Sequence, residues 1–138
     1  MAAAAVTRLG SGGPWEDRYG YSRVVRAGDL AITAGCTATV DGRVAHVGDA
    51  AGQTAEALRI GLAALAEVGA GPVDVIRTRL YVTDRSHADA VGRAHQEVFG
   101  AVRPVATMVV VAGLIDPDLL VEVELEAYLP PAADKLLP

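Results

Sequence analysis

Apolar and polar residues alternate along several short segments of the chain, which is the pattern of half-buried β-strands. The clearest case is residues 75–83, where one face would carry Ile76, Thr78, Leu80 and Val82 and the other Arg77, Arg79 and Tyr81. The strands predicted in this way cover residues 22–25, 30–34, 43–47, 75–83, 106–112 and 120–128. Turn residues such as Asp41-Gly42 and Asp116-Pro117-Asp118 separate them.

Two segments instead show the spacing of three and four residues that is typical of amphipathic helices. The first covers residues 50–68, with Asp49 as its N-cap and Gly69 at its end. Its apolar face would hold Ala51, Ala55, Leu58, Leu62 and Leu65. The second begins at a capping-box-like pair, Ser86 and Asp89, and ends at Gly100. Its face would hold Ala88, Val91, Ala94, His95 and Val98.

The order of these elements is strands, helix, strand, helix and two strands. It predicts an α+β domain in which two helices cover one face of a mainly antiparallel or mixed sheet. With 138 residues and no internal repeat or linker, we expect a single domain over residues 1–138. Residues 1–18 form a flexible lead-in in this prediction, and residues 130–138 form a tail.

The last predicted strand places Glu122, Glu124 and Glu126 on one face. Carboxylates in a row repel one another unless cations lie near, and Arg77 and Arg79 occupy a similar polar face of another strand. The pattern therefore predicts an ionic network on the open face of the sheet. Because apolar residues occur on the neighbouring strand, we also expect several subunits to place these faces together.

Composition narrows the classes of function. There are 12 Lys+Arg against 17 Asp+Glu, a net charge of −5, which argues against a protein whose main task is to bind nucleic acid. One cysteine and no paired Cys/His spacing predict neither a disulfide nor a metal site, and fit a reducing cytoplasm. The apolar stretches are too short for a signal-peptide core or for the roughly 20 residues that cross a bilayer.

Five strings occur in an order and spacing that resemble the RidA (YjgF) family, formerly labelled endoribonuclease L-PSP. They are residues 19–23 (YGYSR), 33–36 (TAGC), 74–84 (DVIRTRLYVTD), 103–111 (RPVATMVVV) and 116–124 (DPDLLVEVE). The resemblance covers about residues 19–128. It implies a chorismate-mutase-like subunit and a homotrimer whose sheets form a central barrel, with ligand clefts between subunits. For the best-known members it also implies hydrolysis of enamines and imines to keto acids and ammonia.

The resemblance assigns candidate site residues. Glu122 matches the acidic residue that positions or activates water, and Tyr21 matches a tyrosine that lines the cleft. In the deaminating members an arginine in a Pro-Ala-Arg-Ser motif clamps the substrate carboxylate, whereas here Ala106 stands at that position within Pro104-Val105-Ala106-Thr107. Gly92 replaces an asparagine that is often found early in the second helix. The chain therefore resembles a divergent subgroup of this family, and 2-aminoacrylate deamination is not its expected reaction.

Each candidate has a structural alternative. Glu122 is either catalytic or an ion-pair partner of Arg77 or Arg79. Arg79 either supplies the charge lost at Ala106 or forms a salt bridge with Glu122 or Glu124. Cys36 sits where the resemblance places the cleft, although a lone thiol in an apolar strand is usually a packing residue.

Trp15, the sole tryptophan, either folds over a ligand as a lid or anchors the N-terminus. His95 is expected to be a core or interface histidine. Backbone groups near Thr107 and Met108 would bind a polar atom of the substrate.

Two functions follow from these candidates. The first is a cytoplasmic, trimeric enzyme that hydrolyses or tautomerises a small imine, enamine or related carbonyl compound without a cofactor or metal. The second is a non-catalytic trimer that binds a metabolite or a protein partner. Glu122 favours the first, and the loss of the arginine at Ala106 favours the second.

Overall fold

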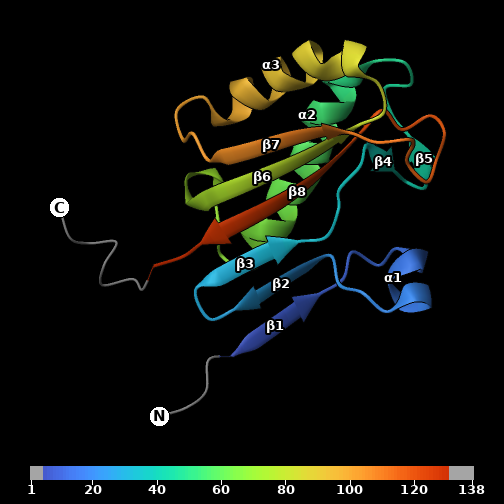
Figure 1. The fold of residues 1–138 in the computed structure, drawn as a ribbon. Coiled ribbons are helices and arrows are strands. Elements are labelled where there is room, and N and C mark those ends of the chain that lie inside the picture. Colours follow the sequence, from blue (N-terminus) through green and yellow to red (C-terminus); the bar gives the residue numbers. More distant parts are fainter. Residues whose placement is uncertain (1–4, 131–138) are drawn as a thin grey trace.

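The computed structural model describes residues 5–130, and these form a two-layer arrangement of a sheet and two long helices (Figure 1). The main sheet has the strand order β1-β2-β3-β8-β6-β7, and β4 and β5 form a separate hairpin. The strands are β1 (Val6–Leu9), β2 (Val24–Ala27), β3 (Leu30–Thr33), β4 (Thr39–Val40), β5 (Arg43–Val44), β6 (Val75–Val82), β7 (Val105–Val110) and β8 (Val121–Tyr128). The helices are α1 (Pro14–Tyr19), α2 (Ala50–Glu67) and α3 (Ala88–Phe99), with short 3₁₀ turns η1 (Pro72–Asp74) and η2 (Arg85–His87).

The main sheet is mixed, because β7 runs parallel to β6 while the other neighbouring pairs are antiparallel. Helix α3 makes the crossover between β6 and β7, as a parallel pair requires. Helices α2 and α3 lie together on one face, and the opposite face is open (Figure 1). The predicted α+β class with a mixed sheet is therefore confirmed.

The core lies between this sheet and helix α2. On β8 the apolar residues Val121, Val123, Leu125 and Ala127 are fully buried, while the glutamates that alternate with them are half-buried. Leu58 and Leu65 of α2 are fully buried against this face. The period of two in β8 therefore places its apolar side under the helices and its carboxylates on the open side.

Helix α2 begins as predicted, because the Asp49 carboxylate accepts a hydrogen bond from the Gly52 N–H at 2.9 Å. The predicted apolar face was wrong in part, since Ala51 and Ala55 are exposed while Gln53 and Thr54 are fully buried. The helix approaches the sheet through small residues. A methyl group on Gly61 would come within 2.8 Å of a Leu125 methyl group, so a glycine lets the two layers meet closely there.

The predicted lead-in of residues 1–18 contains two elements that the pattern did not predict. Strand β1 pairs antiparallel with β2 at the edge of the sheet. Helix α1 begins at Pro14 and ends at Gly20, whose φ of 76° favours glycine. Both elements are too short to show a periodicity. Residues 1–4 and most of the predicted tail, 131–138, lie outside the described residues.

Two local predictions, the burial of Ile76 and the capping box at the start of α3, were also wrong. Ile76 is exposed because an irregularity between Val75 and Arg77 shifts the register with β8. Helix α3 lacks the Ser86–Asp89 capping box. Asp84 instead accepts a hydrogen bond from the Ser86 N–H at 2.8 Å and caps η2, which leads into α3.

The predicted strand 43–47 is shorter than expected, since β5 ends at Val44 and His46 has a φ of 53°. Within residues 5–130 there is no helix that is both long and apolar enough to span a membrane.

Candidate functional site

Glu122 lies on the open face of β8, where the chain after β3 passes alongside it. Cys36 forms an isolated antiparallel bridge with Val123, through N–H···O bonds of 2.7 and 2.9 Å. This bridge places Gly35 directly against the Glu122 side chain, and a methyl group on Gly35 would overlap the Glu122 carboxyl group. The carboxyl group therefore packs against the backbone of Gly35, in a recess that a side chain at position 35 would fill.

The surroundings of Glu122 favour its protonated form. Burial raises the pKa of Glu122, and the neighbouring charge of Glu124 raises it further, while Arg23 lowers it in part. A raised pKa keeps a carboxyl group in its acid form to higher pH than usual, which brings it closer to the pKa that a general acid–base group needs. Glu122 thus has the environment that general acid–base chemistry requires.

Arg23, just before β2, connects this recess to helix α1. Its Nη1 atom donates a hydrogen bond of 2.5 Å to the Gly35 carbonyl oxygen and lies 3.7 Å from the Cys36 Sγ atom. Its Nε atom lies 3.5 Å from the carboxylate of Glu16, a residue that is only 6% exposed. Neither Arg23 nor Glu16 was among the predicted site residues, although Arg23 belongs to one of the matched strings.

Glu16 is held in place from α1 and the residues before it. The Ser11 N–H and hydroxyl groups donate hydrogen bonds of 2.7 and 2.5 Å to its carboxylate. Burial raises the pKa of Glu16, but these hydrogen bonds and the charge of Arg23 outweigh it, and the net change is downward. The Glu16 side chain is therefore an ionised carboxylate that lies against the Nε atom of Arg23 and helps to fix its position. Sequence periodicity carries no signal for it, because α1 is only six residues long.

Cys36 and Tyr21 lie in the same cluster. The Cys36 side chain is buried, and burial raises the pKa of its thiol, although Arg23 opposes this effect. The Tyr21 ring lies 5.8 Å from the Arg23 guanidinium carbon and is 41% exposed. Two of the predicted binding residues therefore adjoin Glu122 through Arg23.

Trp15 lies on α1, where its ring stacks on Tyr19 with 5.6 Å between the ring centroids and an angle of 3° between the planes. The guanidinium carbon of Arg18 lies 5.6 Å from the centroid of each of these two rings. Trp15 is half exposed, and the Glu16–Arg23 ion pair joins its helix to the recess. The structure shows no contact between Trp15 and Glu122.

The predicted residues on β7 point in two directions. Residues directly opposite one another on neighbouring strands share a face of the sheet. Ala106 and Met108 pair with Thr78 and Leu80, whose side chains are buried under the helices, whereas Thr107 pairs with Arg79 on the open face. Within one subunit, Ala106 and Glu122 are thus on opposite faces of the sheet.

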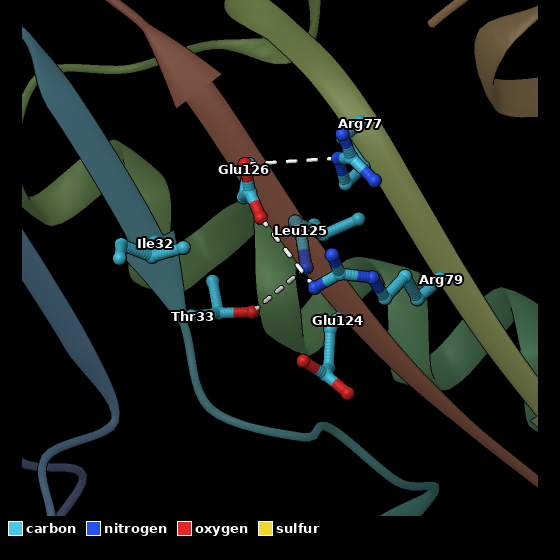
Figure 2. Close-up of a pocket in the computed structure, with 7 residues that line it drawn as sticks. All are labelled: Ile32, Thr33, Arg77, Arg79, Glu124, Leu125 and Glu126. Carbon is cyan, nitrogen blue, oxygen red and sulfur yellow. Dashed lines mark hydrogen bonds and ion pairs between the residues drawn. The ribbon is translucent and has the colours of Figure 1, made fainter. Parts of the chain in front are cut away.

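Arg79 takes part in the predicted ionic network of the open face (Figure 2). Its Nη1 atom lies 3.6 Å from Glu126, and the Nε atom of Arg77 lies 3.9 Å from the same carboxylate. Arg79 therefore forms the ion pair that the sequence predicts, but its partner is Glu126 and not Glu122 or Glu124. The structure does not bring Arg79 to Ala106, which lies on the other face.

These charged residues surround a shallow hollow of about 310 Å³ on the open face, shown in Figure 2. It is lined by Ile32, Thr33, Arg77, Arg79, Glu124, Leu125 and Glu126. Glu122 and Arg23 are not part of it. Because groups with perturbed pKa values cluster at functional sites, and burial raises the pKa of Glu122, the Glu122 recess is the candidate site.

His95 occupies the layer between α3 and the sheet. Its Nε2 atom lies 2.8 Å from the Thr78 hydroxyl oxygen, and its ring packs at 5.0 Å on that of Phe99. Burial lowers the pKa of His95. This agrees with the expected packing histidine. Across residues 5–130, no three His, Cys, Asp or Glu side chains are grouped so that they could hold a metal ion.

The fold and the recess define a small α+β protein with a polar site at the end of a mixed sheet, and the comparisons with known proteins agree. The endoribonuclease L-PSP family model matches residues 16–129. The chain belongs to this family, which is the RidA/YjgF family that its sequence motifs resemble.

Individual relatives lie within the same family. Protein SCO2049 of Streptomyces coelicolor is 48% identical over 128 residues, which cover 93% of this chain and 96% of the relative. The crystal structure of Rv2704 from Mycobacterium tuberculosis, described as a YjgF/YER057c/UK114 family member, has a TM-score of 0.82 at 46% identity and covers 91% of this chain and 100% of its own. The 3-aminoacrylate deaminase RutC of Acinetobacter baylyi is 34% identical over 85 residues, 62% of this chain and 67% of the relative.

Proposed function

We propose that this protein is a cytoplasmic enzyme that hydrolyses or tautomerises a small imine, enamine or related carbonyl compound, with Glu122 as the catalytic residue. The observation that carries the proposal is the Glu122 carboxyl group, which is recessed against Gly35 with its pKa raised by burial. The similarity to a 3-aminoacrylate deaminase supports the class of reaction.

The reaction needs little beyond proton transfer. In its acid form Glu122 protonates the imine nitrogen, which makes the carbon of the C=N bond more electrophilic. Water then adds to that carbon, and the Glu122 carboxylate accepts a proton from it. Glu122 then returns this proton to the amine nitrogen, and as the C–N bond breaks its carboxylate accepts the proton of the hydroxyl group, so that imine and water become a carbonyl compound and ammonia. Each step lies within the range of a positioned carboxyl group.

The complete cleft in this proposal lies between two subunits of a homotrimer. Ala106 and Met108 are on the helix side of β7, while Glu122 is on the open face of β8. A second copy that brings its β7 edge to the Glu122 recess would place the two groups together. The exposed apolar residues of the open face, including Leu30, Ile32, Val105 and Val109, support such a packing of sheets.

A second function is favoured by Ala106. Without a cation at this position, the chain lacks the carboxylate clamp that the family resemblance implies. A trimer that binds a metabolite or a protein partner without catalysis is consistent with that loss. In this case Glu122 would serve only to hold the loop that contains Gly35.

Ammonia release distinguishes these two functions. The substrate is 2-iminopropanoate, generated in the assay by oxidation of alanine with an amino acid oxidase. We expect the wild-type protein to accelerate ammonia release measurably but weakly, because this substrate is the tautomer of 2-aminoacrylate and Ala106 replaces the arginine of the deaminating members, and we expect Glu122→Gln to abolish the acceleration. Glu124→Gln is the matched control, because it removes a half-buried carboxylate from the same face and should retain activity within a few-fold.

The assay can overturn the enzymatic proposal. The wild type is also assayed with an enamine and with an aliphatic ketimine that lacks a carboxylate. If it accelerates none of these reactions, the non-catalytic trimer is the remaining function. Equal activity in wild type and Glu122→Gln would remove Glu122 from the reaction.

A further inference from the structure

Arg23 is the cation that shares the recess of Glu122. Both side chains border Gly35: Arg23 donates a hydrogen bond to its carbonyl oxygen, and the Glu122 carboxyl group packs against its Cα atom. The Arg23 charge also acts on Glu122 and on the Cys36 thiol. A ligand that reaches Glu122 therefore comes close to a guanidinium group.

One edge of this guanidinium remains available. Its Nη1 atom donates to Gly35 and its Nε atom faces Glu16, whereas Nη2 donates no hydrogen bond to any residue between 5 and 130. No buried side-chain nitrogen in the described part of the chain lacks a partner. The Nη2 atom of Arg23 therefore reaches solvent, even though the side chain as a whole is only 16% exposed.

The contacts that Nη1 and Nε of Arg23 make with Gly35 and Glu16 fix the direction of the Nη2 atom. Glu16 is itself held by two hydrogen bonds from Ser11, and the Gly35 carbonyl belongs to the segment that is bridged to β8. A guanidinium that is already immobilised loses little conformational entropy when it binds a ligand.

The other arginines of the open face are occupied elsewhere. Arg77 and Arg79 both pair with Glu126, and position 106 is an uncharged alanine. Arg23 is thus the described cation that combines a fixed position beside Glu122 with a free N–H edge.

We propose that Arg23 binds the anionic group of the substrate through Nη2, which makes the substrate a small imine or enamine that carries a carboxylate. This inference rests on the proposed function for the reacting C=N group, but the binding step can be tested without turnover. Arg23 would take over, from the segment just before β2, the role that the family resemblance assigns to the residue at position 106.

The surrounding charges favour a monoanion. Glu16, Glu122 and Glu124 lie near the guanidinium or near one another, so a phosphate dianion would meet stronger repulsion than a carboxylate. A carboxylate bound at Nη2 also favours the uncharged acid form of Glu122. That is the form which donates a proton to the nitrogen of the substrate. The half-exposed Tyr21 ring beside Arg23 offers a flat surface for a planar C=N or C=C group.

The experiment compares a carboxylate with its neutral counterpart of the same size. Binding of pyruvate and of pyruvamide is measured by calorimetry for the wild type, Arg23→Gln, Arg23→Lys and Arg79→Gln. We expect the wild type to bind pyruvate about tenfold or more tightly than pyruvamide, because charge-assisted hydrogen bonds to guanidinium are strong. Arg23→Gln should abolish this preference, Arg23→Lys should reduce it, and Arg79→Gln should retain it.

A wild-type preference that survives in Arg23→Gln, or no preference in the wild type, overturns the inference. Because Arg23→Gln removes the Glu16 contact and could impair folding, a pyruvate soak of wild-type crystals provides a second measurement. The carboxylate is expected within hydrogen-bond distance of Arg23 Nη2, and its location at Arg79 would refute the proposal.

Failure of the two proposals is distinguishable. If pyruvate binds through Arg23 but no imine or enamine is turned over, only the proposed reaction fails. If turnover depends on Glu122 but carboxylate binding does not depend on Arg23, only this inference fails.

Discussion

The carboxyl group of Glu122 and the Cα atom of Gly35 are in such close contact that a side chain at position 35 would displace the carboxyl group. The contact exists because Cys36 and Val123 exchange two backbone hydrogen bonds, which bring the chain after β3 onto β8. Two residues that are 87 positions apart in sequence (122 − 35) are thus in direct contact at the candidate site.

The first prediction follows from this contact. Gly35→Ala should displace the Glu122 carboxyl group and lower the rate of ammonia release at least about tenfold, because small misplacements of a catalytic group are costly. Gly113→Ala is the matched control, since a methyl group there meets no atom within 4 Å. Steady-state kinetics of both variants checks the prediction, and equal rates would contradict the assigned position of the carboxyl group.

The second prediction concerns stability and pH. Since burial raises the pKa of Glu122 in the folded state, its contribution to stability is full below the pKa of an unfolded glutamate. It is lost as the pH rises through the higher folded-state pKa. Glu122→Gln cannot ionise, so its Tm should exceed that of the wild type at neutral pH, and the difference should shrink towards about pH 4.

Thermal melts of both proteins between acid and neutral pH test this expectation. Glu126→Gln is the control, because it removes the ion pairs with Arg77 and Arg79 and should bring no gain at neutral pH. A Glu122→Gln variant that is less stable than the wild type at neutral pH would show that the carboxylate is stabilising.

The third prediction concerns Cys36, whose thiol is buried and has a raised pKa. Because only the thiolate reacts, alkylation by iodoacetamide at mildly alkaline pH should be at least about tenfold slower in the folded protein than in urea. Mass spectrometry at timed intervals measures both rates. Rapid labelling of the folded protein would contradict this expectation and reveal an activated thiol.

The fourth prediction concerns Gln53, which is fully buried on α2. Its amide nitrogen donates to the carbonyl oxygens of His46 and Asp118 at 3.3 and 3.0 Å, and its oxygen accepts from the Leu120 N–H at 2.8 Å. Gln53→Leu leaves these buried groups unpaired and should lower the free energy of unfolding by about 3 kcal/mol.

Urea denaturation measures this loss. The exposed Gln96 provides the control, and Gln96→Leu should change stability by no more than about 0.5 kcal/mol. A similar effect of the two substitutions would indicate that the loops before α2 and before β8 do not depend on Gln53.

The fifth prediction concerns the assembly. Ile32 lies on the open face opposite Glu126 and is 45% exposed, an unusual position for a large apolar side chain in a sheet. Sedimentation at micromolar concentration should show a trimer for the wild type and smaller species for Ile32→Glu. Val73→Glu should remain a trimer, because Val73 lies in η1, outside the sheet. A monomeric wild type would contradict the inter-subunit cleft.

Periodicity was sufficient for the longer elements. The alternation in β8 and the Asp49 cap of α2 are local signals, since side-chain direction and capping depend on residues close in sequence. The same signals failed where tertiary packing decided the outcome. Gln53 is buried because two distant loops need its amide group, and Ile76 is exposed because β6 changes its register against β8.

The sequence by itself determined the α+β class, the family and the candidacy of Glu122, because these depend on patterns and strings that can be read along the chain. Only the tertiary structure showed that Arg23 rather than Arg79 accompanies Glu122, and that Ala106 lies on the other face of the sheet. The physical reason is that a site depends on contacts between strands. Register, strand order and the close approach at Gly35 determine those contacts, and no local pattern of residues encodes them.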